Sequence, residues 1–74
     1  MEGRQLRGIK AEEAIKVFIK AGGKVRKGKG SHINIKMPNG QIITIPGKGE
    51  LKIGLIKTAI VKAGLNIEKF INLL

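Results

Sequence analysis

The residue best suited to chemistry is His32, the only histidine in the 74-residue chain. It lies in the stretch KGKGSHINIKMPNG, close to Lys27, Lys29 and Lys36. An imidazole can accept or donate a proton near neutral pH, and lysines and backbone N–H groups can stabilise a charged phosphate. These residue types suit the cleavage of RNA, because the ribose 2′-OH supplies the nucleophile and the protein only has to move protons and stabilise the phosphorane.

Other reaction types are disfavoured by the residues available. A zinc site needs roughly three or four nitrogen or sulfur ligands, and the chain has one histidine and no cysteine. Two-metal nucleases need clustered carboxylates, whereas aspartate is absent and the five glutamates are scattered. Ser31 adjoins His32, but neighbouring strand residues point to opposite faces, so Ser31 is a poor nucleophile for this base. No P-loop or dinucleotide fingerprint occurs, and we expect no metal and no small-molecule cofactor.

The charge of the chain predicts a polyanionic partner. Fifteen lysines and arginines stand against five acidic residues, a formal net charge of +10. Neutralising phosphates releases condensed counterions, so RNA is the leading candidate, ahead of an anionic membrane surface or an acidic protein. No apolar run approaches the ~20 residues of a membrane span, and the lack of cysteine fits a reducing compartment. We therefore expect a soluble, cytoplasmic protein.

Two longer helices are predicted from apolar residues at three- and four-residue spacing. The first covers residues 10–21 and ends at Gly22-Gly23, where glycine suits a C-terminal cap. Its expected buried stripe is Ala11, Ala14, Ile15, Phe18 and Ile19. The second covers residues 53–63 and is capped by Gly64, with Leu55, Ile56, Ala59, Ile60 and Ala63 on its stripe. Asn66 can then N-cap a short helix over residues 67–73.

Three strands are predicted between the helices. Residues 24–28 form a basic strand with Val25 facing inward, and residues 31–37 alternate between isoleucine or methionine and polar residues. Pro38-Asn39-Gly40 then indicates a hairpin. A three-residue loop pairs Met37 with Gln41 and brings the alternate isoleucines onto one face. A two-residue turn would instead expose Ile43 and Ile45.

The expected fold class is therefore α+β, with the order helix, three antiparallel strands, helix, and a short C-terminal helix. Residues 1–74 form a single domain in which residues 1–9 are an N-terminal arm. Helices that flank a block of strands pack on one face of the sheet and leave the other face open. The three-residue loop places His32 on that open face opposite Pro46, at the start of the loop Gly47-Lys48-Gly49, with Asn34 opposite Thr44.

The same segments carry a resemblance to a known family. The run AGGKVRKGKGSH, the turn PNG, the strand end ITIP and the segment GELKIGLIKTAIVKAGLNIEKF resemble the HicA (YcfA-like) family of messenger-RNA interferase toxins. The match covers about residues 6–70. Each piece is weak alone, but the GSH motif, the turn and the end of the second helix occur in the family's order and at its spacings.

This resemblance implies a fold similar to the double-stranded-RNA-binding domain and ribosome-independent endonucleolytic cleavage of RNA. It implies that the histidine of the GSH motif, here His32, is catalytic. It also implies a HicB-like antitoxin as the protein partner. Many family members have a second histidine, where this chain has Ile33 or the loop Gly47-Lys48-Gly49. The second proton-transfer group is therefore open between Lys48, Lys29 and a substrate-bound water.

Two functions and one further possibility follow. The leading hypothesis is a metal-independent endoribonuclease toxin that acts on messenger RNA, with His32 as general base or acid. Its expected RNA- and phosphate-binding residues are Lys27, Lys29, Gly30, Ser31, Lys36 and Lys48. The alternative is a non-catalytic RNA-binding module of the same fold, and the third possibility is a subunit whose basic face docks an acidic protein.

Overall fold

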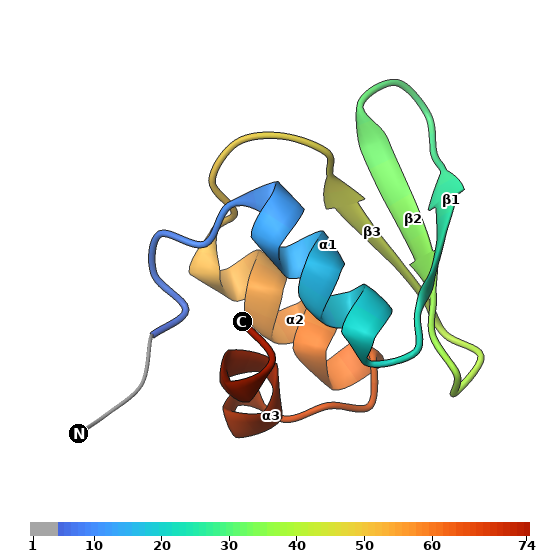
Figure 1. The fold of residues 1–74 in the computed structure, drawn as a ribbon. Helices are drawn as coiled ribbons and strands as arrows, with labels where there is room; N and C mark the ends of the chain where they lie inside the picture. The colour runs from blue at the N-terminus through green and yellow to red at the C-terminus, as the bar shows by residue number, and fades with distance from the viewer. Residues whose placement is uncertain (1–4) are drawn as a thin grey trace.

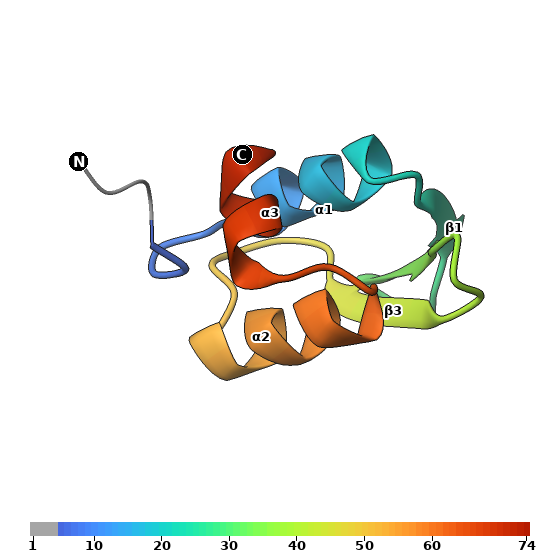
Figure 2. The same ribbon diagram turned by 90° about the horizontal axis from the view of Figure 1, so that it is seen from below.

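The computed structural model describes residues 5–74. Its elements are α1 (Ala11–Lys20), β1 (Lys24–Lys27), β2 (His32–Lys36), β3 (Ile42–Pro46), α2 (Ile53–Lys62) and α3 (Ile67–Asn72). The helices α1 and α2 pack against one face of a three-stranded sheet, α3 lies beside them, and the opposite face of the sheet is open (Figures 1 and 2). This arrangement confirms the predicted α+β class and the α-β-β-β-α layout. Within residues 5–74, none of the helices has the length and apolar character needed to cross a membrane.

The sheet is antiparallel with the strand order β1-β2-β3. Ile35 lies opposite Ile43, and His32 lies opposite Pro46. The Met37 N–H donates to the Gln41 carbonyl at 2.8 Å, which closes a three-residue loop. These pairings confirm the predicted register. The loop length matters because a loop one residue shorter would move the isoleucines of β3 from the buried face to the open face.

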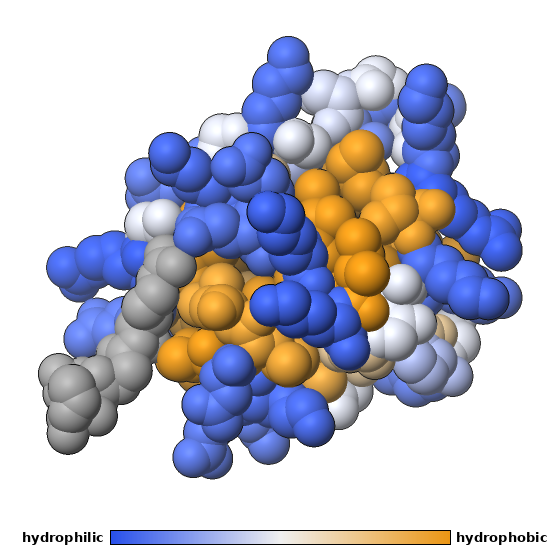
Figure 3. All heavy atoms as spheres, viewed as in Figure 1, coloured by the Kyte–Doolittle hydropathy of each residue, from blue (hydrophilic) through white to orange (hydrophobic). Residues whose placement is uncertain are grey.

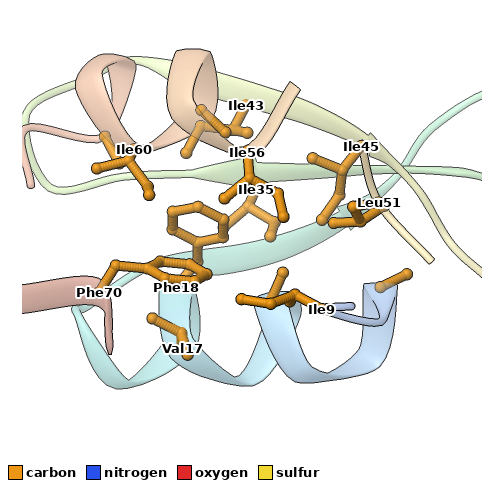
Figure 4. Packing of buried hydrophobic residues seen from close by; sticks show 14 of the residues in the cluster. Ile9, Val17, Phe18, Ile35, Ile43, Ile45, Leu51, Ile56, Ile60 and Phe70 are labelled. Atoms are coloured by element: carbon orange, nitrogen blue, oxygen red, sulfur yellow. The ribbon is translucent and has the colours of Figure 1, made fainter. Parts of the chain in front are cut away.

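The core is almost entirely aliphatic and draws residues from every layer (Figure 4). Phe18 and Phe70 pack with ring centroids 5.5 Å apart and join α1 to α3. Ile35 and Ile45 come from the sheet, and Ile56 comes from α2, and all three are fully buried. The three helices and the sheet therefore share one core rather than forming separate clusters.

The buried stripe of α1 differs from the predicted one. Val17 is buried and Ile19 is 47% exposed, whereas the spacing predicted Ile19 as a stripe residue. The reason is that α3 and the C-terminus lie beside α1, where the Lys20 ammonium donates to the Leu73 carbonyl at 3.0 Å. Packing against this neighbour rotates the buried side of α1 toward Val17.

Val25 shares a face of the sheet with its cross-strand partner Ile35, as predicted, but it is 46% exposed. It lies on an edge strand, and Figure 3 shows an apolar area where the sheet extends beyond α1. Val25 therefore points to the helix side of the sheet but stays partly exposed, because no helix covers that edge.

The segment before α1 is tied to the body. Leu6 and Ile9 are buried in the core. Lys10 forms an isolated antiparallel bridge with Glu50, which joins the entry to α1 to the loop that follows β3. Residues 1–4 of the predicted arm lie outside the described residues.

Candidate active site and nucleic-acid interface

His32 is the first residue of β2 and lies exposed on the open face of the sheet. The β1–β2 turn and the C-terminal end of β3 lie at the same end of the sheet (Figure 1). Three chain segments therefore meet around His32: the turn before it, β2 itself, and the loop after its partner Pro46.

One carbonyl of the turn before His32 positions both its backbone and its imidazole ring. The Lys29 carbonyl accepts the His32 backbone N–H at 3.0 Å and lies 3.3 Å from His32 Nδ1. Gly30 has a φ of +59°, a left-handed conformation that glycine adopts at little cost. In the tautomer with its proton on Nδ1, the ring donates to this carbonyl and leaves the Nε2 lone pair free. This nitrogen can then accept a proton from a bound substrate.

The loop between β3 and α2, residues 47–52, is held by backbone hydrogen bonds at both ends and is called the fixed loop below. The Gly47 N–H donates to the Ser31 carbonyl at 2.7 Å, and the Leu51 N–H donates to the Ile9 carbonyl at 2.8 Å. A Cβ at Gly47 would lie only 2.5 Å from the Ser31 carbonyl oxygen, so a residue with a side chain does not fit there without a shift. These contacts hold the exposed Lys48 next to the strand end that carries Pro46.

The predicted phosphate-binding residues divide into three groups. Lys29, Gly30 and Ser31 precede His32 directly, and Lys48 lies in the fixed loop. Lys36 is on the same face of the sheet as His32 but at the opposite end of β2. Lys27 pairs with Ile33, so its Cβ points to the helix side rather than to the open face.

Two basic residues on the open face were not among the expected site residues. Arg26 lies opposite Asn34, and Lys24 lies opposite Lys36. The sequence carried a signal for them, because extending the pairing from β2 to β1 places alternate β1 residues on the open face. The predicted inward position of Val25 gives the same result, because period two then puts Lys24 and Arg26 on the open face.

The centre of the open face is polar. The Thr44 hydroxyl donates to Asn34 Oδ1 at 2.7 Å, which leaves the Asn34 amide N–H groups for another partner. Among residues 5–74, no three His, Cys, Asp or Glu side chains gather in an arrangement that could hold a metal ion. The polar and charged groups here can bind phosphate and sugar oxygens, and His32 can move a proton.

The fold and this site define a small cationic α+β protein with one exposed histidine on an open sheet. A family model described as the HicA toxin of bacterial toxin-antitoxin systems matches residues 11–65. The match spans α1 to the end of α2 and includes His32, both hairpin turns and the fixed loop. The chain therefore belongs to the HicA toxin family, as the sequence motifs indicated. No curated protein matches the chain.

Proposed function

We propose that this protein is a metal-independent endoribonuclease that cleaves messenger RNA as the toxin of a toxin-antitoxin pair. The observation that carries the proposal is the placement of His32. Its Nδ1 faces the Lys29 carbonyl, and its ring lies exposed on a sheet face whose charged side chains are all cationic. Family membership supports the toxin role.

The proposed reaction is transesterification within RNA. His32 Nε2 removes the 2′-OH proton, and the 2′ oxygen attacks the adjacent phosphorus as the bond from phosphorus to the 5′ oxygen breaks. The leaving 5′ oxygen takes a proton, so the products end in a 2′,3′-cyclic phosphate and a 5′-hydroxyl. Lys29, Lys48 and the backbone N–H groups of the turn would stabilise the extra negative charge of the phosphorane. Lys48, Lys29 or a bound water would supply the second proton.

The protein partner that we propose is a HicB-like antitoxin. A formal net charge of +10 favours a partner with an acidic surface. Such a partner would compete with RNA for the open face. Co-purification with the product of an adjacent reading frame, lost at high salt, would test this assignment.

A second candidate is a non-catalytic RNA-binding module. The observation in its favour is that His32 is the only histidine, so the usual pair of imidazoles for acid and base is absent. Such a module would bind RNA with strong salt dependence and leave it intact.

The decisive experiment incubates purified protein with RNA in the presence of a chelator. We expect His32→Ala to lower the cleavage rate by roughly 10²–10⁴-fold, the usual contribution of general acid–base catalysis. RNA with a 2′-deoxy nucleotide at the cut site should resist cleavage. Lys57→Ala, an exposed substitution on α2, is the matched control and should cleave at the wild-type rate. Equal cleavage by wild type and His32→Ala would end the catalytic proposal, and binding without any cleavage would favour the second candidate.

A further inference from the structure

A second cluster of cations lies on the open face, away from His32. Lys24 on β1 is directly opposite Lys36 on β2, and Arg26 is opposite Asn34, the next open-face position on β2. None of the three strands contains an acidic residue. Three positive side chains therefore share one corner of the sheet.

This arrangement carries a cost to stability. Like charges directly opposite each other on a sheet are destabilising. Within residues 5–74, no hydrogen bond or ion pair joins the side chains of Lys24, Arg26 or Lys36 to another residue. A local arrangement that works against folding without compensation is typical of a binding site. An anion from outside the protein would relieve this repulsion.

The three cations of this cluster line a pocket that is large enough for a phosphate group. Its volume is about 300 Å³, and it is lined by Gly22, Lys24, Arg26, Lys36, Met37 and Pro38. Gly22 has a φ of +100°, and a Cβ there would lie 2.8 Å from Pro38 Cγ. The end of α1 and the β2–β3 turn thus meet too closely for a side chain at this position. An arginine beside two lysines matches the oxygens of a phosphate group.

The pocket is separate from the His32 end of the sheet. Lys36 is four residues from His32 along β2, which at ~3.3 Å per residue is about 13 Å. This separation is greater than that between neighbouring phosphates of a nucleotide chain. A single phosphate cannot contact both places, but one RNA strand crossing Asn34 and Thr44 can.

We propose that Lys24, Arg26 and Lys36 form a second phosphate-binding subsite for single-stranded RNA, which holds a backbone phosphate away from the scissile bond. The inference rests on the proposed ribonuclease function and makes RNA length a determinant of binding. The subsite contacts phosphate rather than bases, so it adds affinity without selecting a sequence. It also assigns Arg26, rather than Lys27, to the RNA-binding face.

The test measures binding of 2′-O-methyl RNA, which lacks the attacking hydroxyl and cannot be cleaved by this route. The probes are a dinucleotide and an oligonucleotide of about eight nucleotides, within the range of site sizes known for single-stranded binding. The subsite variant combines Lys24→Gln, Arg26→Gln and Lys36→Gln. The control combines Lys52→Gln, Lys57→Gln and Lys62→Gln, and it removes the same charge from exposed residues in and just before α2.

We expect the subsite variant to bind the longer probe more weakly than the control does, with no difference for the dinucleotide. The slope of log K against log salt should fall by about 0.7, because the variant loses its contact with one phosphate and each such contact contributes about 0.7 for single strands. The subsite variant should also melt at a higher temperature than wild type, since the opposed charges are gone, and this measurement excludes misfolding as the cause.

Equal weakening by the two triple variants would overturn the proposal, because net charge alone would then explain the binding. Unchanged affinity of the subsite variant for the longer probe would overturn it too. Neither result depends on cleavage. A failure of the subsite is therefore distinguishable from a failure of the ribonuclease function, which the His32→Ala assay tests separately.

Discussion

At the scale of single residues, backbone contacts position His32. The Lys29 carbonyl lies near both its backbone N–H and its ring nitrogen. Gly28 and Gly47 flank this arrangement, and a Cβ at either position would lie within 3.0 Å of a neighbouring carbonyl oxygen. Close backbone approach therefore explains these two glycines, and it brings the turn and the fixed loop to either side of the histidine.

The contact at Gly47 leads to a prediction about stability. Gly47→Ala should destabilise the protein by about 1–3 kcal/mol, the typical cost of forcing an extra methyl group into a packed site. The new Cβ would be 2.5 Å from the Ser31 carbonyl oxygen. Chemical denaturation measures the loss. Gly54→Ala on α2 is the control, because no atom lies within 4 Å of its added Cβ, and it should stabilise by up to about 1 kcal/mol. Equal effects of the two substitutions would show that close approach at Gly47 is unimportant.

At the scale of secondary-structure elements, the β2–β3 turn also holds the end of α2. Asn39 Oδ1 accepts the Gln41 N–H at 3.0 Å, and Asn39 Nδ2 donates to the Lys62 carbonyl at 3.0 Å. The second bond pairs one of the carbonyls that every helix leaves free at its C-terminus. One side chain therefore both shapes the hairpin and fastens it to the helix layer.

We expect Asn39→Ala to destabilise the protein by about 1–2 kcal/mol, because two hydrogen bonds are lost. Asn39→Asp keeps the acceptor for Gln41 but removes the donor to Lys62. It should retain the hairpin and weaken only its attachment to α2. Amide hydrogen exchange separates the two variants: alanine should increase exchange in the turn and at the end of α2, whereas aspartate should increase it at the helix alone. Identical exchange in both variants would contradict the division of roles between the two amide atoms.

At the scale of the whole molecule, a small aliphatic core depends on its two aromatic residues. Phe18 and Phe70 are at most 1% exposed and in contact, although they are 52 residues apart in the chain. Their contact closes the helix layer against the sheet. The open face carries no core residue, so its cations can serve binding while the opposite face supplies stability.

Phe70→Ala should cost about 3–5 kcal/mol of stability, the usual range for removing a buried phenylalanine. Small domains have only about 5–15 kcal/mol in total, so the midpoint of unfolding should fall sharply. Thermal and denaturant unfolding measure this change. Val61→Ala, at a side chain that is 76% exposed, is the control and should change stability by less than about 0.5 kcal/mol. A small effect of Phe70→Ala would mean that α3 is not part of the cooperative core.

Much of the fold could be predicted from the sequence because local rules determine it. Periods of two and of three to four residues predicted the strands and the helices, and the three-residue loop predicted that His32 lies opposite Pro46. Gly64 and Leu65 end α2 as expected, since the Leu65 N–H donates to the Ile60 carbonyl at 3.0 Å. The absence of cysteine and aspartate from the sequence argued against a thiolate metal site and against a site built on clustered carboxylates. Apart from composition, these features follow from local periodicity and from the length of a single turn.

Only the tertiary structure decided the features that depend on distant segments. The buried side of α1 includes Val17 because α3 packs beside it, and Lys48 is held because its loop bonds to the Ile9 segment. The β1–β2 pairing decides which open-face residues lie side by side, with Lys24 opposite Lys36 and Arg26 opposite Asn34. Local periodicity assigns a residue to one face of its own element, whereas packing between elements determines which of those faces meet and which remain open to a ligand.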